Sequence, residues 1–297
     1  MHILTFDVEE WFHILDNAST KEEAQWDKYE RRLDANMARI FDLLESRGQK
    51  ATFFCLGWVA RHFPHIIREI HDRGFQIATH SDRHQLAFEQ TPEEFRSDLE
   101  QSIKCLEDTA GVRIRAYRAP GFSVKEDNIW VFEELIAAGI EVDCSVFPAA
   151  HAHGGFKAFG KETPTLINTP SGTLKEFPIN THRIFGKPFI FSGGGYFRLL
   201  PGSLICRFSQ QSDYVMTYFH PRDFDPDQPM IPDLSFYRKF KSYYGLRGAR
   251  AKLEMLLDGQ QFISLEAAEN SLDWTRVPQV NLIQGHLEKS LSPGLFG

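Results

Sequence analysis

The sequence predicts a single α/β domain in which helices cover a parallel sheet. Three observations lead to this fold class. The chain has 297 residues, a usual length for an α/β barrel. Its composition is globular, with 42% hydrophobic and 25% charged residues. Strand-like and helix-like segments also alternate through the first half of the chain. We therefore expect one domain over residues 1–297.

The elements of the first half follow from apolar spacing and from residues that start and stop helices. Strands are expected at residues 2–8, 51–56, 75–79, 116–118 and 140–144. Helices are expected between them at residues 33–45, 59–72, 92–108 and 125–138. The third helix has the clearest beginning, because Thr91 and Glu94 can form a capping box around Pro92.

The second half is less regular. Residues 147–200 are rich in Gly, Pro and Thr, which predicts an insertion over the barrel mouth at about residues 148–212. A strand is expected at 215–219, a helix near 247–257 and a last strand at 261–265. The tail after residue 273 is expected to be irregular.

Charge and cysteine spacing exclude several classes of protein. The net charge of −7 and the pI near 6.0 argue against a nucleic-acid-binding protein, which usually has a basic face. The first residues are acidic where a secretory signal needs basic ones, and no apolar run reaches the ~18 residues of a membrane span. We therefore expect a cytoplasmic protein. The cysteines lie far apart, which predicts free, mostly buried thiols at Cys55, Cys105, Cys144 and Cys206.

Acidic residues follow the first strand, at the end where a barrel gathers its chemistry. Residues 5–9 read TFDVE. Side chains alternate along a strand, so Asp7 and Glu9 point to the same side. Two carboxylates in one site repel each other unless a metal ion or an arginine compensates their charge. A solvated acidic turn is the alternative interpretation.

Two histidines follow the third strand, where residues 80–84 read HSDRH. Imidazoles four residues apart can converge on one ion, and zinc accepts such a pair with a carboxylate as third ligand and a position left for water. An isolated pair with this spacing is usually incidental. Its place at a strand end, in a chain that also offers Asp7 and Glu9, favours a metal site.

Further polar residues end the later strands. Residues 118–122 read RAPGF, in which Arg118 can hold a carboxylate and the Pro-Gly pair sets a tight turn that can present a backbone N–H to a substrate oxygen. Asp143 ends the fifth strand, and His220 ends the strand at 215–219. A lone histidine is usually structural, but this position favours proton transfer.

These segments, in this order, resemble the polysaccharide deacetylases, also called carbohydrate esterase family four. Residues 5–9 are similar to the first motif of the family, usually TFDD, and residues 80–84 to its second, H-[ST]-x-x-H. Residues 118–121 resemble the third motif, Asp143 the fourth, and residues 218–220 the fifth. The resemblance covers about residues 1–148 and 213–270.

The chain departs from the family pattern in three places. Val8 replaces the second aspartate of TFDD, which resembles a subgroup with a D-V-E start in which Glu9 would be a metal ligand. Cys144 stands where many relatives have tryptophan. The segment between Asp143 and His220 is longer than usual, as the expected insertion requires. These departures concern the choice of substrate more than the reaction.

The resemblance implies a distorted (β/α)7–8 barrel that removes an N-acetyl group from a carbohydrate with one divalent metal ion, zinc first and cobalt as a substitute. The residues that it implies for the metal are Glu9, His80 and His84. It also implies Asp7 as general base, Arg118 as the partner of that base, His220 as general acid, Asp143 as a carboxylate that orients a catalytic side chain or supports His220, and Pro120, Gly121 and Phe122 beside the oxyanion.

The expected location limits the candidate substrates to two classes. A cytoplasmic enzyme of this kind would act on a soluble aminosugar conjugate or on a polyprenyl-diphosphate-linked precursor of a cell-surface polysaccharide such as lipopolysaccharide. Residues 236–244 read FYRKFKSYY and are followed by Arg247, Arg250 and Lys252. Alternating aromatic and basic residues suit the cytoplasmic face of a membrane, which favours the lipid-linked precursor. An ordinary amphipathic surface helix is the alternative.

Two rival functions remain open. The motifs do not separate acetyl from formyl groups, so a deformylase or another metal amidohydrolase on a sugar conjugate is one rival. A catalytically inactive glycan-binding barrel is the other. The presence of a candidate base, three ligands, an arginine and an acid favours an enzyme.

Overall fold

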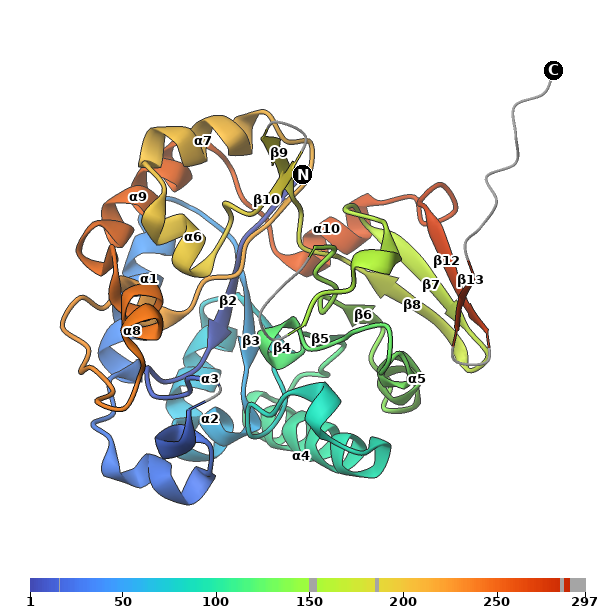
Figure 1. The fold of residues 1–297 in the computed structure, drawn as a ribbon, viewed down its shortest axis with the longest axis horizontal. Coiled ribbons are helices and arrows are strands. Elements are labelled where there is room, and N and C mark those ends of the chain that lie inside the picture. The colour runs from blue at the N-terminus through green and yellow to red at the C-terminus, as the bar shows by residue number, and fades with distance from the viewer. Residues whose placement is uncertain (16, 150–153, 185–186, 284–285, 289–297) are drawn as a thin grey trace.

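The computed structural model describes residues 1–15, 17–149, 154–184, 187–283 and 286–288. Its centre is a nine-stranded sheet with the order β13-β12-β7-β8-β6-β5-β4-β3-β2 (Figure 1). The strands from β2 through β6 to β8 are parallel, whereas β7 and β13 each run antiparallel to a neighbour. Because these parallel strands end at the same edge, the side chains that follow them meet there.

The strands are β1 (His2–Ile3), β2 (Thr5–Val8), β3 (Thr52–Cys55), β4 (Gln76–Thr79), β5 (Ala116–Tyr117), β6 (Val142–Asp143), β7 (Thr165–Thr169), β8 (Gly172–Glu176), β9 (His182–Ile184), β10 (Lys187–Phe189), β11 (Val215–Met216), β12 (Gln279–Ile283) and β13 (His286–Glu288). The α-helices are α1 (Leu33–Glu45), α2 (Gly57–His62), α3 (Pro64–Asp72), α4 (Pro92–Ala110), α5 (Trp130–Ala137), α6 (Gly194–Leu199), α7 (Gly202–Gln210), α8 (Phe236–Tyr243), α9 (Leu246–Gly259) and α10 (Leu265–Ser271). Short 3-10 turns are η1 (Ala18–Thr20), η2 (Glu23–Lys28), η3 (Ala87–Glu89), η4 (Pro120–Phe122), η5 (Lys157–Phe159) and η6 (Pro221–Phe224).

The segment 214–219 lies between the first strands of the sheet and the residues that follow β8. On one side, β1 pairs with β11, and single bridges join Phe6 to Phe219 and Gly193 to Tyr218. On the other side, the Tyr214 hydroxyl donates to the carbonyl of Pro178, 2.7 Å away. The described strands do not form one closed sheet, but this arrangement is the distorted barrel that the resemblance implies.

The first half follows the expected alternation closely. The helix expected at 33–45 is α1, and its apolar face is buried against the sheet. Burial of each such side chain contributes roughly 1.5–3 kcal/mol. The capping box of α4 is present, because the Thr91 hydroxyl accepts from Glu94 N at 3.2 Å and the Glu94 carboxylate accepts from Thr91 N at 2.8 Å.

Two expected helices have different bounds. The helix expected at 59–72 is two helices, α2 and α3, because Pro64 has no N–H to donate and begins a new helix instead of continuing the first. The helix expected at 125–138 begins only at Trp130. The Asn128 side chain accepts from Lys125 N at 2.6 Å and holds the preceding residues in a turn.

The second half contains more regular structure than expected. Hairpin β7–β8 belongs to the main sheet, and hairpin β9–β10 pairs by itself. The strand expected at 261–265 is only a single bridge between Ile3 and Ile263, ahead of α10. The tail expected to be irregular contains β12 and β13, because β12 gains a distant partner in β7. Residues 150–153 and 185–186 of the expected insertion, and 284–285 and 289–297 of the tail, lie outside the described residues.

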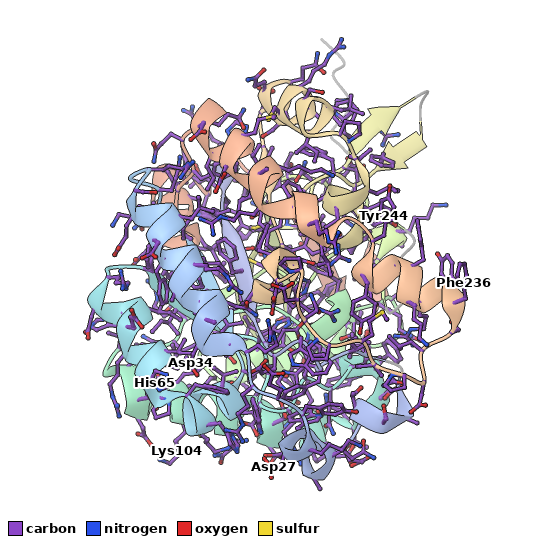
Figure 2. The ribbon with its side chains drawn as sticks, turned by 90° about the vertical axis from the view of Figure 1, so that its left-hand side faces the viewer. Asp27, Asp34, His65, Lys104, Phe236 and Tyr244 are labelled. Carbon is purple, nitrogen blue, oxygen red and sulfur yellow. The ribbon has the colours of Figure 1, made fainter. Side chains whose placement is uncertain are left out.

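Helices α6 to α9 cover one side of the molecule (Figure 1). Helices α6 and α7 pack against α9. Turned by 90°, the molecule presents Phe236 and Tyr244 on its outer surface, at either end of α8, with Lys104 of α4 far below them (Figure 2). Within the described residues no helix is long and apolar enough to cross a membrane. The four cysteines are free, as expected, and Cys55 and Cys144 are buried. The division into one domain with an insertion stays a prediction.

Candidate active site

The carboxyl ends of β2, β4 and β5 converge on one pocket of about 440 Å³. Asp7 lies in β2, His80 directly follows β4, and Arg118 directly follows β5. The predicted residues that line the pocket are Asp7, Glu9, His80, His84, Gly121, Phe122 and His220. The structure therefore brings together most of the residues that sequence reasoning selected from five separate segments.

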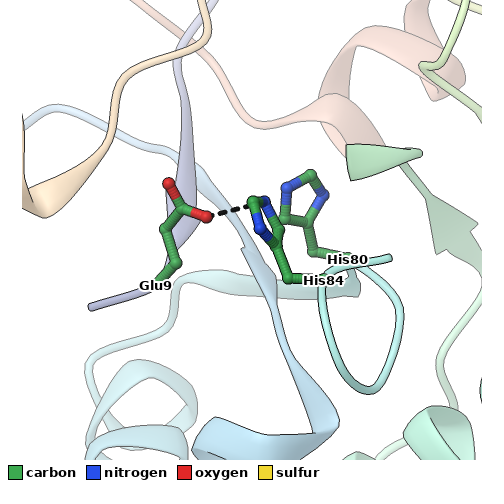
Figure 3. A group of neighbouring side chains, drawn as sticks. All are labelled: Glu9, His80 and His84. Atoms are coloured by element: carbon green, nitrogen blue, oxygen red, sulfur yellow. Dashed lines mark ion pairs between the residues drawn. The ribbon is translucent and has the colours of Figure 1, made fainter. Parts of the chain in front are cut away.

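Three of these side chains form a group that could hold a metal ion. One ligand atom from each of Glu9, His80 and His84 lies within 4.8 Å of the other two (Figure 3). Glu9 Oε2 is 2.7 Å from His84 Nε2. This oxygen is nevertheless buried without a hydrogen-bond partner among the described residues. The carboxylate and the two imidazoles thus face one point, and the carboxylate has an oxygen without a hydrogen-bond partner. This donor set fits a divalent cation, whose ligand bonds are about 2.0–2.2 Å long.

The pKa values of His80 and Glu9 also fit a metal site, since a carboxylate ligand must be an anion and an imidazole ligand must be neutral. Burial lowers the pKa of His80 to about 4. Its Nδ1 is 2.8 Å from the carbonyl of Arg118, so Nδ1–H donates there and Nε2 is left for the ion. Burial raises the pKa of Glu9, but the charge and contact of His84 outweigh it and lower this pKa to about 2.

The turn between the two histidines has an uncommon backbone. Ser81 and His84 have φ angles of 73° and 56°, in the left-handed region. Such residues cost about 1–3 kcal/mol each and need support from their surroundings. Asp98 of α4 provides support, because its carboxylate accepts from Asp82 N at 2.7 Å and from Arg83 N at 3.2 Å. This turn places both imidazoles on the same side of the strand end.

Asp7 is held by Arg118, which is entirely buried. The Arg118 Nη1 donates to Asp7 Oδ1 at 2.7 Å and to Thr5 Oγ1 at 2.8 Å. Its guanidinium lies 4.1 Å from the ring centre of Phe54. The arginine thus compensates the charge of the Asp7 carboxylate and fixes its orientation, which leaves Asp7 Oδ2 directed toward His220 at 3.9 Å.

His220 faces the two carboxylates and is itself backed by a third. Its Nε2 is 3.6 Å from Glu9 Oε1, and its Nδ1 is 3.0 Å from Asp223 Oδ2. Asp223 also accepts from Arg198 Nη1 at 2.5 Å. Burial lowers the pKa of His220, but the charge of Asp223 and its hydrogen bond outweigh burial and raise it to about 9. His220 is therefore a cation at neutral pH.

Asp143 lies outside the pocket and is not the partner of His220. It is fully buried, and it accepts from the Ser145 hydroxyl at 2.5 Å. The Ser145 oxygen accepts in turn from Ala119 N at 2.8 Å. The expectation that Asp143 supports His220 is thus wrong, because Asp223 occupies that position. Through Ser145, Asp143 is instead connected to Ala119, in the turn that follows Arg118.

That turn forms one wall of the pocket. Gly121 and Phe122 have φ angles of 61° and 53°, so two consecutive residues adopt the left-handed conformation. The Phe122 ring packs edge-on against Tyr218, with 5.1 Å between ring centres. Pro120 begins the turn and is buried, but it does not line the pocket.

Sequence reasoning missed Asp223, Arg198 and His13. Asp223 follows His220 by three residues, and Pro221 starts the short turn that brings it back; this HPRD spacing is the only signal that could have identified it. His13 lies where the pocket meets a neighbouring one of about 620 Å³. Its Nδ1 accepts from Glu10 N at 3.2 Å, and burial lowers its pKa well below the usual value, so it is neutral.

Comparisons with known proteins divide the chain into two parts. Residues 16–138 match the Polysaccharide deacetylase family, and residues 144–269 match a domain of unknown function, DUF3473. A peptidoglycan-N-acetylglucosamine deacetylase of Bacillus cereus is 30% identical over 97 residues, which are 32% of this chain and 35% of that protein. A bifunctional xylanase/deacetylase of Pseudobutyrivibrio xylanivorans is 28% identical over 88 residues, 29% of this chain and 15% of that protein. The chain thus matches about a third or less of the length of these relatives.

The fold has a counterpart among solved structures. A crystal structure from Mycobacterium smegmatis, described as that of a polysaccharide deacetylase, superposes with a TM-score of 0.61 and 16% identity over 94% of this chain and 93% of that one. The matched residues 16–138 contain His80, His84 and Arg118, and the fold brings Asp7 and Glu9 to them from outside that range. Residues 16–138 thus match the polysaccharide deacetylase family, and the chain as a whole has the fold of that solved structure.

Proposed function

We propose that the protein removes the N-acetyl group from an N-acetylhexosamine of a glycan, with a divalent metal ion, zinc in the first place, held by Glu9, His80 and His84. One observation carries this proposal. The three candidate ligands converge beside an arginine-held carboxylate, Asp7, and a protonated imidazole, His220. Amide hydrolysis requires a base for the water and an acid for the leaving nitrogen, and Asp7 Oδ2 and His220 Nε2 lie 3.9 Å apart in the pocket.

The roles of the side chains follow from their partners. A divalent cation at this site supplies Lewis-acid activation of the water and of the acetyl carbonyl. Asp7 accepts a proton from the water while the water oxygen bonds to the acetyl carbon. Arg118 keeps the Asp7 carboxylate in place through its 2.7 Å hydrogen bond. His220 then donates its Nε2 proton to the nitrogen as the C–N bond breaks, and acetic acid and a free amine leave.

Two other groups support this chemistry in the proposal. Asp223 and Arg198 hold the His220 ring through Nδ1, so that Nε2 is the atom that faces the substrate. The turn at Gly121 and Phe122 forms the wall against which the substrate oxygen would lie. An inactive glycan-binding protein would not need this complete set, and its presence favours an enzyme over that rival.

We further propose that the glycan is a polyprenyl-diphosphate-linked precursor of a cell-surface polysaccharide, such as lipopolysaccharide, at the cytoplasmic face of a membrane. The support is the surface of α8, whose aromatic and basic side chains adjoin the pocket mouth. A soluble aminosugar conjugate is the other candidate substrate, and it would not require that surface.

Mass spectrometry tests both parts of the proposal. Lipid-linked and water-soluble N-acetylated glycans are incubated with metal-loaded protein, with the His80→Ala variant as the inactive control. Loss of one acetyl mass from the lipid-linked glycan is the expected result. Loss from soluble glycans alone would remove the lipid-linked substrate, loss from a formylated analogue alone would favour the deformylase, and no loss from any glycan would contradict the proposed function.

A further inference from the structure

Helix α8 (Phe236–Tyr243) is the most exposed apolar element of the described structure. None of its residues is buried. Seven large hydrophobic side chains are exposed among the described residues, and four of them lie within residues 236–244. Phe236 is 87% exposed, Tyr237 73%, Phe240 48% and Tyr244 50%. Apolar surface that is gathered in this way usually marks a contact with another molecule or with a membrane.

The same segment carries a concentrated positive charge. Residues 236–253 contain six lysines and arginines and no acidic residue, in a chain whose net charge is −7. The basic residues are Arg238, Lys239, Lys241, Arg247, Arg250 and Lys252. The remainder of the chain is therefore strongly acidic, and this segment is the part that an anionic surface would attract.

This surface is joined to the candidate active site. Tyr237, Arg238, Lys241 and Ser242 line the same pocket as Asp7 and Glu9. Arg198, which holds Asp223 behind His220, also donates to the carbonyl of Lys241 at 2.7 Å. The inner side of α8 is thus the rim of the pocket. Figure 2 shows its outer side, with Phe236 directed away from the rest of the molecule.

We propose that α8 and the basic residues that follow it, through Lys252, form a docking surface for an anionic lipid bilayer. The rings of Phe236, Tyr237 and Phe240 enter the interfacial region, and the neighbouring cations lie against lipid phosphates. Docking brings the rim of the pocket to the headgroup level, where a lipid-linked sugar begins. The purpose of the surface therefore rests on the proposed function, whereas its affinity for lipid does not.

A second copy of the chain is a poorer occupant of this surface. A symmetric dimer brings the same patch of each copy together. Two segments with six cations each would then face one another. Glu254 compensates Arg250 at 2.9 Å, but the remaining like charges would still oppose the apolar contact. An anionic bilayer satisfies the aromatic and the basic side chains together.

Vesicle co-sedimentation of the full chain tests the proposal. The vesicles contain phosphatidylcholine alone or mixed with phosphatidylglycerol. One variant combines Phe236→Ser with Phe240→Ser, and another combines Lys239→Glu with Arg247→Glu; none of these residues lines the pocket. The matched control, Arg68→Glu with Lys104→Glu, changes the net charge equally on exposed residues of α3 and α4.

The wild type and the control should bind the anionic vesicles and release them as salt rises, because charges are screened over about 8–10 Å. The charge variant should bind at least about fivefold more weakly for each cation removed, and the apolar variant should also lose binding. All four proteins should unfold at similar temperatures and deacetylate a water-soluble glycan equally.

Three results would overturn the docking surface: equal binding by all four proteins, equal loss in the control, or a dimer that the apolar variant abolishes without any vesicle binding. Each leaves the deacetylation of the soluble glycan intact, so the proposed function would survive. Vesicle binding without deacetylation by any of the proteins would contradict the proposed function and support the docking surface.

Discussion

The two halves of the molecule supply different parts of the pocket. Residues up to Asp143 provide Asp7, Glu9, His80, His84 and Arg118, all at the ends of parallel strands and nearly all buried. The segment from Gly193 to Tyr244 provides His220, Asp223, Arg198 and the exposed helix α8, on short helices and a 3-10 turn. In the proposed function, the sheet therefore fixes the groups that would bind the metal and the water, and the less regular half provides the proposed acid and the rim of the pocket. Enzymes commonly combine a rigid scaffold with variable segments in this way.

The largest effect on activity is expected in the first half, where variants of the proposed base and of the proposed metal ligands should differ in metal content. His80→Ala should lose the metal and all activity, because an imidazole ligand is removed. Asp7→Asn should keep the metal but lose about 10²–10⁴-fold in kcat/KM, because only the proton acceptor changes. Glu9→Gln should weaken metal binding.

Metal content after dialysis and kcat/KM on an N-acetylated glycan measure the two effects. A chelator should abolish activity, and zinc or cobalt added afterwards should restore it.

His65→Ala is the control for this comparison, because the His65 side chain is 58% exposed and pairs with Asp34 at the surface, away from the pocket. It should retain metal and activity. If Asp7→Asn emptied the site while Glu9→Gln did not, the roles of the two carboxylates would be exchanged.

A smaller effect is expected in the second half, at Asp223. Asp223→Asn keeps a hydrogen-bond acceptor for His220 Nδ1 but removes the charge that raises the pKa of His220 to about 9. In the proposed mechanism the protonated imidazole is the active form, so the alkaline limb of the pH–kcat/KM profile should move to lower pH. At alkaline pH the rate should fall by about 10–100-fold, with unchanged metal content.

The matched control is Asp233→Asn, an exposed aspartate in the same half of the chain. Its pH profile should coincide with that of the wild type. An Asp223→Asn profile that keeps the wild-type alkaline limb would show that Asp223 does not set the charge of His220, and the acid would have to be sought elsewhere.

The difference between the halves also explains what could be predicted from the sequence. Asp7, Glu9, His80, His84 and Arg118 were identifiable because parallel strands end at one edge, so a polar residue at each strand end is placed by topology alone. His220 was found by the same argument. The fold class and most elements of the first half likewise follow from local periodicity.

The remaining features depend on contacts that no local pattern records. In the sequence Asp223 resembles an ordinary turn residue, and only the folded turn η6 brings its side chain to His220. β12 forms because β7 lies beside it. Asn168 of β7 is 111 or more residues away from its side-chain partners Gln279 and Asn281, so no local sequence pattern predicts that pairing. Asp143 was selected as a catalytic or supporting carboxylate because it ends a strand, but its partners Ser145 and Glu176 are set by tertiary packing.

The smallest effect is expected where the two halves meet, at the pair of Asp143 and Glu176. These residues are opposite each other in the register of β6 and β8, and both are fully buried. Burial and the neighbouring charge of Asp143 raise the pKa of Glu176 well above its usual value. Glu176 therefore keeps its proton at neutral pH and shares it with Asp143, since two adjacent buried carboxylates cannot both be anions.

The sign of the pH effect follows from this proton. In the folded state the pKa of Glu176 is raised, so the stability that it contributes is complete below its unfolded pKa and is lost as pH rises through the folded value. Within that window the free energy of unfolding should fall by about 1.4 kcal/mol per pH unit. Glu176→Gln keeps a donor for Asp143 without a proton to lose, so its urea-unfolding midpoint should vary less as pH rises above the ordinary pKa of 4.5. Glu141→Gln is the control, because Arg115 lowers the pKa of Glu141, which stays ionised throughout this range. Parallel curves for wild type and Glu176→Gln would mean that the pair carries no shared proton.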